Sequence, residues 1–343
     1  MNESRDDFRA LLGRVAAGET LGIAEAEHAF DIMMAGEATP AQMGALLMGL
    51  RVRGETVDEI TGGAKAMRAR ALAMEAPPGA IDTCGTGGDA KGTFNISTGA
   101  ALVSAACGVP VAKHGNRALS SKSGSADVLG ALGVNIDADM ALVRDAFFEA
   151  GIGFMMAPRH HGATRHVAPT RVELGTRTIF NLLGPLSNPA GVKRQIIGVF
   201  DQAWVEPMAA VSRNLGSVFV WVVHGSDGMD ELTTTGPSHV VELRGGELRR
   251  FEVTPEDAGL ARATLDDLKG GDGAANAKTM AAMLDGASGP IRDIILLNSA
   301  AALIVAGRVE NLRDGVAEAA QAIDSGAART TLDKLIEITN RSS

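Results

Sequence analysis

The first 75 residues carry the spacing of amphipathic helices and no strand pattern. Apolar side chains recur three and four positions apart at Phe8, Leu11, Leu12 and Val15. Helix caps occur between the expected helices. Gly36 follows the second helix, Thr39 precedes the third, and Thr56 with Glu59 forms a capping box for the fourth. We therefore expect a small all-helical domain over residues 1–75.

After Pro77 and Pro78 the pattern changes to short apolar runs that alternate with helical periods, as in a parallel α/β sheet. The expected strands are residues 81–84, 109–112, 152–156, 196–200 and 218–223. The expected helices between them are residues 98–107, 125–132, 138–150 and 171–174, with another around residue 211. Residues 239–243 and 247–253 flank Gly245-Gly246, which indicates a hairpin, and from residue 276 the chain is helical.

These patterns predict the α/β fold class, with a small all-helical domain before a large α/β domain. The central sheet of the large domain is expected to be mostly parallel and flanked by helices. We expect this domain to comprise residues 76–167 and 187–343, with a helical segment near residues 168–186 joining the small domain. A chain of 343 residues with 45% hydrophobic content is long enough for two domains of roughly 100 to 200 residues each.

The composition argues against nucleic-acid and membrane partners. The formal net charge is -9, tyrosine is absent and aromatic residues make up 3%, so surplus cations and stacking rings are scarce. Cys84 and Cys107 are too few for a disulfide framework. The start of the chain lacks the apolar segment of a signal peptide, and no apolar run reaches the roughly 20 residues that span a bilayer. We expect a cytoplasmic protein.

A glycine-rich loop follows the first expected strand. Residues 85–89 are Gly-Thr-Gly-Gly-Asp, and residues 93–98, Thr-Phe-Asn-Ile-Ser-Thr, lead into a helix. Glycines let backbone N–H groups approach a phosphate, and a helix N-terminus adds partial positive charge. The spacing matches neither a dinucleotide-binding fingerprint nor a Walker loop. An anion cradle is the functional interpretation, and an ordinary turn with a helix cap is the alternative.

A basic loop follows the second expected strand directly. Residues 113–117 are Lys-His-Gly-Asn-Arg, and residues 120–125 add several hydroxyls. Ligands of open α/β sheets bind beyond the carboxyl ends of strands. Lys113 suits a phosphate as a point charge, and Asn116 can donate and accept toward an organic substrate. A solvated basic loop is the alternative.

Two further groups of polar residues carry candidate chemistry. Asp230-Glu231 lies beyond the strand at 218–223, and adjacent carboxylates suit Mg²⁺ that also binds substrate phosphates, although a surface acidic pair is the plain alternative. Residues 159–166 hold three histidines, but their spacing matches no standard zinc site. The planar guanidinium of Arg171 suits a substrate carboxylate.

Taken in order, these motifs resemble the anthranilate phosphoribosyltransferase family, which shares its fold with the pyrimidine nucleoside phosphorylases. The resemblance covers nearly the whole chain. The motifs that carry it are Gly-Thr-Gly-Gly-Asp at 85–89, Lys-His-Gly-Asn-Arg at 113–117, Arg-Thr-Ile-Phe-Asn-Leu-Leu-Gly-Pro-Leu at 177–186 and Asp-Glu at 230–231. The family joins anthranilate to the phosphoribosyl group of phosphoribosyl pyrophosphate in tryptophan biosynthesis.

The resemblance also implies a role for individual residues. The implied phosphoribosyl pyrophosphate site comprises Gly85, Gly88, Asp89, Thr93, Asn95, Ile96, Ser97, Thr98, Lys113, His114, Gly115, Asn116, Arg117, Ala118, Leu119, Ser120, Ser121 and Ser125. The implied anthranilate contacts are Gly85, His114, Asn116, His161 and Arg171. The implied ligands of two Mg²⁺ ions are Ser97, Asp230 and Glu231, and the implied catalytic residues are Asp230 and Glu231, acting through metal, and Lys113. A homodimer and domain closure are implied likewise.

Two other functions are compatible with the same fold. A pyrimidine nucleoside phosphorylase would bind phosphate and a nucleoside, but Asn116 and Arg171 favour anthranilate. A non-enzymatic nucleic-acid-binding relative is opposed by the acidic net charge and by the presence of Asp230-Glu231.

Overall fold

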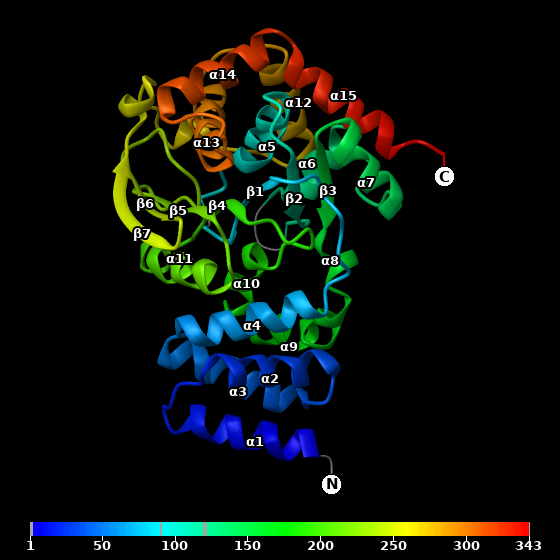
Figure 1. Cartoon of the computed structure of the whole chain (residues 1–343), viewed down its shortest axis with the longest axis vertical. Coiled ribbons are helices and arrows are strands. Elements are labelled where there is room, and N and C mark those ends of the chain that lie inside the picture. Colours follow the sequence, from blue (N-terminus) through cyan, green and yellow to red (C-terminus); the bar gives the residue numbers. More distant parts are fainter. Residues whose placement is uncertain (1–2, 90, 119–121, 343) are drawn as a thin grey trace.

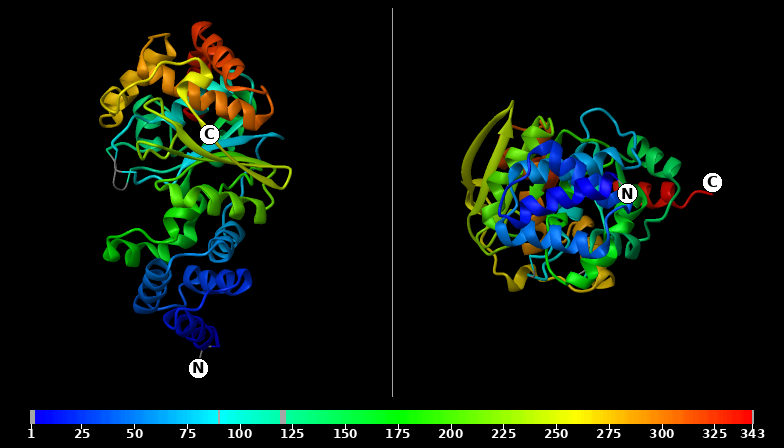
Figure 2. Two further views of the ribbon diagram at one scale, coloured as in Figure 1. Left: turned by 90° about the vertical axis from the view of Figure 1, so that its left-hand side faces the viewer. Right: turned by 90° about the horizontal axis from the view of Figure 1, so that it is seen from below.

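The N-terminal region of the computed structural model, which describes residues 3–89, 91–118 and 122–342, consists of helices alone (Figure 1). The helices before the first strand are α1 Glu3–Ala16, α2 Ile23–Ala35, α3 Pro40–Arg53 and α4 Val57–Ala69. The predicted caps are confirmed. Gly36 has a left-handed φ of 77° after α2, the Thr39 hydroxyl accepts from the backbone of α3, and Thr56 with Glu59 forms the capping box of α4. Figure 2 shows these helices together at one end of the molecule.

The strands of the described residues form one sheet in the order β3-β2-β1-β4-β5-β6-β7. Their bounds are β1 Ile81–Gly85, β2 Val111–Gly115, β3 Ile152–Met156, β4 Arg194–Gly198, β5 Phe219–Gly225, β6 Ser238–Arg244 and β7 Glu247–Val253. Strands β1 to β5 pair in parallel, and β6 and β7 add an antiparallel hairpin. Its turn needs glycine because Gly245 and Gly246 have φ of 58° and 88°. The predicted mostly parallel sheet is confirmed.

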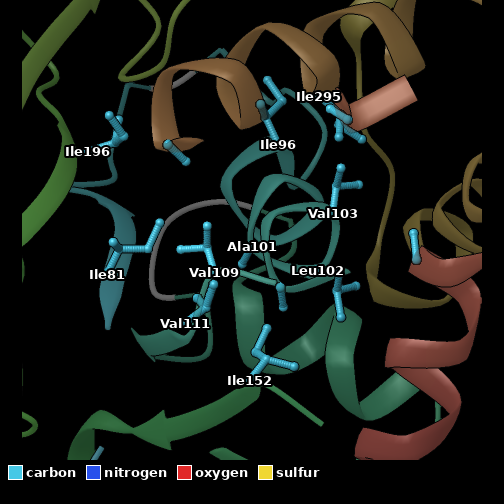
Figure 3. Close-up of a cluster of buried hydrophobic side chains, with 14 of the residues drawn as sticks. Ile81, Ile96, Ala101, Leu102, Val103, Val109, Val111, Ile152, Ile196 and Ile295 are labelled. Atoms are coloured by element: carbon cyan, nitrogen blue, oxygen red, sulfur yellow. The ribbon is translucent and has the colours of Figure 1, made fainter. Parts of the chain in front are cut away.

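Neighbouring residues of the central strands point into two different helical layers, because side chains alternate along a strand. On β4, Ile196 packs into one core and Ile197 into the other. Figure 3 shows the first core, in which Ile81, Ile196 and Ile295 are drawn. Its layer contains α5 Ile96–Ala106, α12 Gly273–Leu284, α13 Pro290–Ala306, α14 Leu312–Asp324 and α15 Ala327–Thr339, with α6 Ser125–Ala131 and α7 Met140–Glu149 nearer β3.

The second layer joins the sheet to the N-terminal helices. It contains α10 Phe180–Leu186 and α11 Val205–Asn214, both of which pack against α4. Before α10 the chain forms α8 Ala157–His160, the 3-10 turn η1 Gly162–His166 and α9 Ala168–Leu174. Helix α9 packs against α3, and the ring of Phe180 lies 5.4 Å from that of Phe30. The segment at 168–186 therefore packs on the N-terminal helices. No helix in the described ranges is long and apolar enough to cross a membrane.

The predicted position of the second strand was wrong by several residues. The apolar run ends at Ala112, yet β2 continues through Lys113 to Gly115. Lys113 can occupy a buried strand position because its ammonium group donates to the carbonyl of Thr83 on the neighbouring strand, at 2.7 Å. The strand expected at 196–200 likewise begins earlier, at Arg194, whose guanidinium donates to the carbonyl of Val305.

Candidate active site

The candidate site lies at the carboxyl ends of β1, β2, β4 and β5. Strands β1 and β4 are neighbours, and the chain leaves β1 toward β2 on one side but leaves β4 toward β5 on the other, so the connections after these two strands diverge. Such a switch point in an open α/β sheet leaves a crevice where ligands bind. The loop after β1 is the glycine-rich motif, and the loop after β5 carries Asp230-Glu231.

Asp230 lies directly against the ends of β1 and β4. Its Oδ2 accepts from the backbone N–H of Gly87 at 2.7 Å. A Cβ on Gly85 would meet the Asp230 carboxylate, and a Cβ on Gly198 would meet the Asp230 carbonyl, both well inside the 3.0 Å that real Cβ contacts keep. Glycine at these two positions therefore allows the close approach of the loops.

Three carboxylates gather around this contact. Burial raises the pKa of Asp230, and the charge of Asp89 raises it further. Burial also raises the pKa of Glu231, with a further rise from Asp230 and a partial offset from Lys113. Oδ2 of Asp89 is buried and has no hydrogen-bond partner among the described residues. The raised pKa values show that these carboxyls disfavour one another's charge, and a bound cation would relieve that repulsion.

The glycine-rich loop is fixed by an arginine to which the sequence analysis assigned no role. Gly87 and Gly88 both have positive φ, of 66° and 75°. The carbonyl of Gly88 accepts a hydrogen bond from Arg177, whose guanidinium lies 4.1 Å from the ring centroid of Phe200. Stacked on this ring and bonded to the loop, Arg177 connects the residues before α10 to the loop after β1.

The start of α5 closes the other side of the loop. The backbone N–H of Ser97 donates to Oε1 of Glu231 at 3.0 Å. Oδ1 of Asn95 accepts from the Ser123 hydroxyl at 3.1 Å and from Nδ2 of Asn276 at 2.8 Å. Asn276, at the start of α12, was not singled out from the sequence, where 181 positions separate it from Asn95.

Three residues that were expected in the donor site are placed differently from its other members. The side chains of Ile96 and Thr98 are 1% exposed, and that of Ile96 belongs to the core beneath the sheet, so neither side chain opens onto the loop. Thr93 forms a bridge with Lys269 at the edge of the loop.

Lys113 lies beneath the site. Only 2% of it is exposed, and its ammonium group donates to Thr83 as described above. Asp82, fully buried beside it, accepts from Nδ2 of Asn188 at 2.8 Å and from the backbone of His114 at 3.3 Å. In this geometry the ammonium group of Lys113 is directed into the protein, where it compensates carboxylate charge, and it is not placed to contact a phosphate.

Two neutral imidazoles line the region where the anthranilate contacts were expected. The rings of His114 and His161 lie 5.1 Å apart in an edge-to-face arrangement. Burial lowers the pKa of His114 to about 3 and that of His161 to about 4. Arg171, on α9, lies 5.2 Å from the ring centroid of Phe180, and burial lowers its pKa. The described residues offer Arg171 no ion-pair partner.

The loop after β2 turns back on itself toward α6. A Cβ on Gly115 would collide with the Ser125 hydroxyl, which donates to the carbonyl of Asn116 at 3.4 Å. The side-chain oxygen of Asn116 accepts from the backbone of Arg117 at 2.8 Å.

Asp127 holds the next part of that loop. It accepts from the backbone of Ala118 at 2.9 Å and pairs with Arg117 at 3.5 Å. The remaining predicted donor-site residues, Leu119, Ser120 and Ser121, lie outside the described residues.

Comparison with known proteins identifies the family of this chain. Residues 77–329 match the glycosyl transferase family a/b domain, and residues 9–71 match the helical bundle domain of that family. Anthranilate phosphoribosyltransferase of Paramagnetospirillum magneticum is 64% identical over 98% of this chain and 97% of its own length; that of Azospirillum brasilense is 64% identical over 98% and 94%.

Solved structures agree with these relatives. The crystal structure of the Thermus thermophilus anthranilate phosphoribosyltransferase superposes with a TM-score of 0.91 at 44% identity, covering 96% of this chain and 99% of that one. The Saccharomyces cerevisiae enzyme, in complex with phosphoribosyl pyrophosphate and Mg, gives a TM-score of 0.89 at 26% identity, covering 98% of both chains. The chain belongs to the anthranilate phosphoribosyltransferase family.

Proposed function

We propose that this chain transfers the phosphoribosyl group of phosphoribosyl pyrophosphate to the amine of anthranilate at the carboxyl edge of its sheet. The products are N-(5-phosphoribosyl)anthranilate and pyrophosphate. The reaction is a step of tryptophan biosynthesis. The observation that carries the proposal is the direct contact between the glycine-rich loop and the carboxylate pair, in which the backbone N–H of Gly87 donates to Asp230. An anion cradle and a cation site are thereby joined.

The carboxylate cluster fits Mg²⁺. Asp230 and Glu231 are partly buried carboxylates with raised pKa values, and Oδ2 of Asp89 lacks a partner in the described structure. Mg²⁺ is commonly held by one or two carboxylates together with substrate phosphates. We assign Ser97, Asp230 and Glu231 as the residues that would hold it, with two ions per subunit. The bound metal would stabilise negative charge on the leaving pyrophosphate.

The protein's own groups position the donor. Displacement at the anomeric carbon builds negative charge on pyrophosphate, so fixed donors that point at it lower the barrier. The backbone N–H groups of the glycine-rich loop and the start of α5 supply such donors, joined by side chains of Asn95 and the loop after β2. The positive charge of Lys113 partly offsets the rise in the pKa of Glu231 and so supports the ionised form of that carboxylate.

The acceptor needs orientation more than activation. An aromatic amine is neutral at pH 7 and can attack without prior deprotonation, so its placement near the anomeric carbon should dominate. His114 and His161 stay neutral, and Nε2 of each is buried without a partner in the described structure. We assign these imidazoles to the walls of the anthranilate site, with Asn116 and Arg171 as its polar contacts.

Changing Arg171 to Ala should raise the Michaelis constant for anthranilate about 10- to 100-fold with a smaller change in kcat. The physical reason is the loss of a charge-assisted hydrogen bond to the substrate carboxylate. Steady-state kinetics with anthranilate varied will measure the effect. An unchanged constant would remove Arg171 from the acceptor site.

Changing Arg177 to Lys should raise the Michaelis constant for phosphoribosyl pyrophosphate and leave that for anthranilate nearly unchanged. Lysine keeps the charge but loses the planar group that stacks on Phe200 while donating to Gly88. We expect a change of about tenfold, the scale of one hydrogen bond to a charged group. Equal shifts in both constants would indicate a general structural effect instead.

The proposed reaction is tested by the loss of anthranilate fluorescence when the purified protein is mixed with phosphoribosyl pyrophosphate and Mg²⁺, with EDTA as control. Mg²⁺-dependent loss, with release of pyrophosphate, supports the proposal. A parallel incubation with phosphate and pyrimidine nucleosides tests the phosphorylase alternative. Binding of phosphoribosyl pyrophosphate without any loss of fluorescence would leave the donor site intact and make the acceptor assignment wrong.

We further infer that the active protein is a cytoplasmic homodimer in which residues 1–75 with 168–186 move against the α/β region on substrate binding. Val52 on α3 and Val172 on α9 are 81% and 79% exposed on two helices that pack together, and we place the partner surface on these helices. The two cysteines are unpaired, as in a reducing compartment. Sedimentation and small-angle scattering, with and without substrates, test assembly and movement.

A further inference from the structure

The proposed metal ligands Asp230 and Glu231 lie between two buried apolar residues. Met229 and Leu232 are both 0% exposed, and both belong to the core on the α13 side of the sheet. The two carboxylate residues between them are only partly buried. The backbone of this short segment therefore runs along the surface of the core, and the way it is fixed there determines where the carboxylates stand.

The loop that carries these carboxylates is closed on itself by Asp227. Its Oδ2 accepts from the hydroxyls of Thr233 and Thr235 at 2.6 and 2.7 Å, and its Oδ1 accepts from the backbone N–H of Met229 at 3.1 Å. Charge-assisted hydrogen bonds thus join residues on both sides of the carboxylate pair. Because the loop is tied within itself, its position depends on its attachment to neighbouring elements.

A single buried asparagine on α13 provides one attachment. Asn298 is 2% exposed; its Oδ1 accepts from the backbone N–H of Leu232 at 3.1 Å, and its Nδ2 donates to the carbonyl of Leu232 at 2.9 Å. Nδ2 also donates to the carbonyl of Ile294, one turn earlier in the helix, at 2.9 Å. The carboxamide thus pairs with both backbone groups of the residue that follows Glu231, as a residue of a neighbouring strand would.

Only a carboxamide can make this pair of bonds. It offers an acceptor and two donors, whereas a carboxylate only accepts and a hydroxyl has a single hydrogen. Without Asn298, the N–H and C=O of Leu232 would be buried without partners, which costs free energy for each group. The loop would reduce this cost by shifting toward other partners, and Glu231 would shift with it.

Helix α5 provides the second attachment. The backbone N–H of Ser97 donates to Oε1 of Glu231 at 3.0 Å. Helix α5 packs directly on α13: a Cβ on Gly99 would meet the side chain of Ile295, and Figure 3 shows Ile96 and Ile295 in the core that the two helices share. Glu231 is therefore held from two adjoining helices, by its carboxylate from α5 and by the backbone of the next residue from α13.

We propose that Asn298 is a positioning residue for the metal site, which keeps Glu231 in place relative to Ser97 by binding the backbone of Leu232. The inference rests on the proposed function, in which Ser97 and Glu231 hold Mg²⁺. Loss of Asn298 should therefore weaken the steps that depend on Mg²⁺. The anthranilate contacts lie on other elements and should be unaffected.

Asn298→Ala should raise the Mg²⁺ concentration needed for half-maximal rate about tenfold, the scale of one lost hydrogen bond, and leave the Michaelis constant for anthranilate unchanged. Calorimetric titration with phosphoribosyl pyrophosphate supplies a readout other than rate. The gain in affinity when Mg²⁺ replaces EDTA should shrink by a similar factor. Hydrogen exchange of the metal-free protein should become faster at residues 229–233, because two bonds that fix them are lost.

Two controls separate positioning from a general loss of stability. Thr339→Val, on α15, removes a buried hydroxyl that accepts from the backbone N–H of Asn135 at 3.2 Å, and so removes a comparable bond. Ser299→Ala changes the residue next to Asn298 on α13, where the buried hydroxyl has no partner among the described residues. Thr339→Val should lower the thermal unfolding temperature without changing the Mg²⁺ requirement, and Ser299→Ala should change neither.

A shift in the Mg²⁺ requirement that is confined to Asn298→Ala supports the proposal. An unchanged requirement, or an equal shift in Thr339→Val, overturns it. If Asn298→Ala does not fold, Asn298→Ser decides in its place, since its hydroxyl can bond to the Ile294 carbonyl within the helix. A wild type that transfers no phosphoribosyl group would count against the proposed function instead. Hydrogen exchange at residues 229–233 then decides on Asn298 alone, and unchanged exchange in the variant would overturn its positioning role.

Discussion

Changing Glu231 to Gln should lower kcat at least about a hundredfold and leave the metal-free protein at least as stable as the wild type. The loss of activity follows from the removal of a carboxylate that would hold Mg²⁺ at the leaving group, where one lost stabilising interaction commonly costs about 10²- to 10³-fold. The stability follows from electrostatics, because Glu231 is partly buried and repelled by Asp230. An amide of the same shape relieves that repulsion while still facing the N–H of Ser97.

The same substitution should change how stability depends on pH. Folding raises the pKa of Glu231, so the folded state binds a proton that the unfolded state releases. In the metal-free wild type, the contribution of Glu231 to stability should therefore be largest in acid and should be lost as pH rises through the interval between its unfolded and folded pKa values. Gln at position 231 removes this part of the slope. Thermal unfolding without metal across that interval measures it.

Glu247→Gln provides a matched control, since Glu247 is an exposed carboxylate on β7. It should leave kcat, stability and the pH slope unchanged. Retained activity in Glu231→Gln, with the fold intact, would exclude a metal-holding role for this carboxylate. Lost activity together with a large loss of stability would point to a structural role.

Local signals in the sequence predicted most of the framework. Two examples are the capping box at Thr56 and Glu59 and the paired glycines at 245 and 246. Each depends only on residues close in sequence, so the sequence alone indicates it. The parallel strands were recognisable because β5 is buried along its whole length and therefore apolar nearly throughout. Strand ends were predicted less well, because polar residues there are buried by partners on other strands, as Lys113 is by Thr83.

The candidate site was predicted as a set of motifs but not as a set of contacts. Asn276 bonds to Asn95 across 181 positions, and nothing near either residue indicates the pairing. Arg177 belongs to a recognisable motif, yet its bond to Gly88 depends on how the chain returns from the N-terminal helices. Contacts of this kind follow from the tertiary fold, which local propensity does not encode.

Gly198 is another residue whose role follows from a tertiary contact and not from the local sequence. It ends β4, and its φ is not in the left-handed region, so neither a turn nor backbone strain explains glycine there. The explanation is the carbonyl of Asp230, which occupies the space that a Cβ would fill. The loop after β5 can therefore rest on the end of β4 only if residue 198 is glycine.

Changing Gly198 to Ala should abolish measurable activity, a loss of at least about 10³-fold, because the backbone of Asp230 cannot move aside without displacing its carboxylate and that of Glu231. Inserting one methyl into a packed site costs about 1–3 kcal/mol of stability, so the protein should still fold. Gly130→Ala is the matched control: it lies in α6 with no heavy atom within 4 Å of the added Cβ, and should leave activity unchanged. Kinetics and thermal unfolding of both variants will decide. Near-normal activity in Gly198→Ala would show that the loop can carry its carboxylates in another position, and the proposed dependence of the metal site on this contact would be wrong.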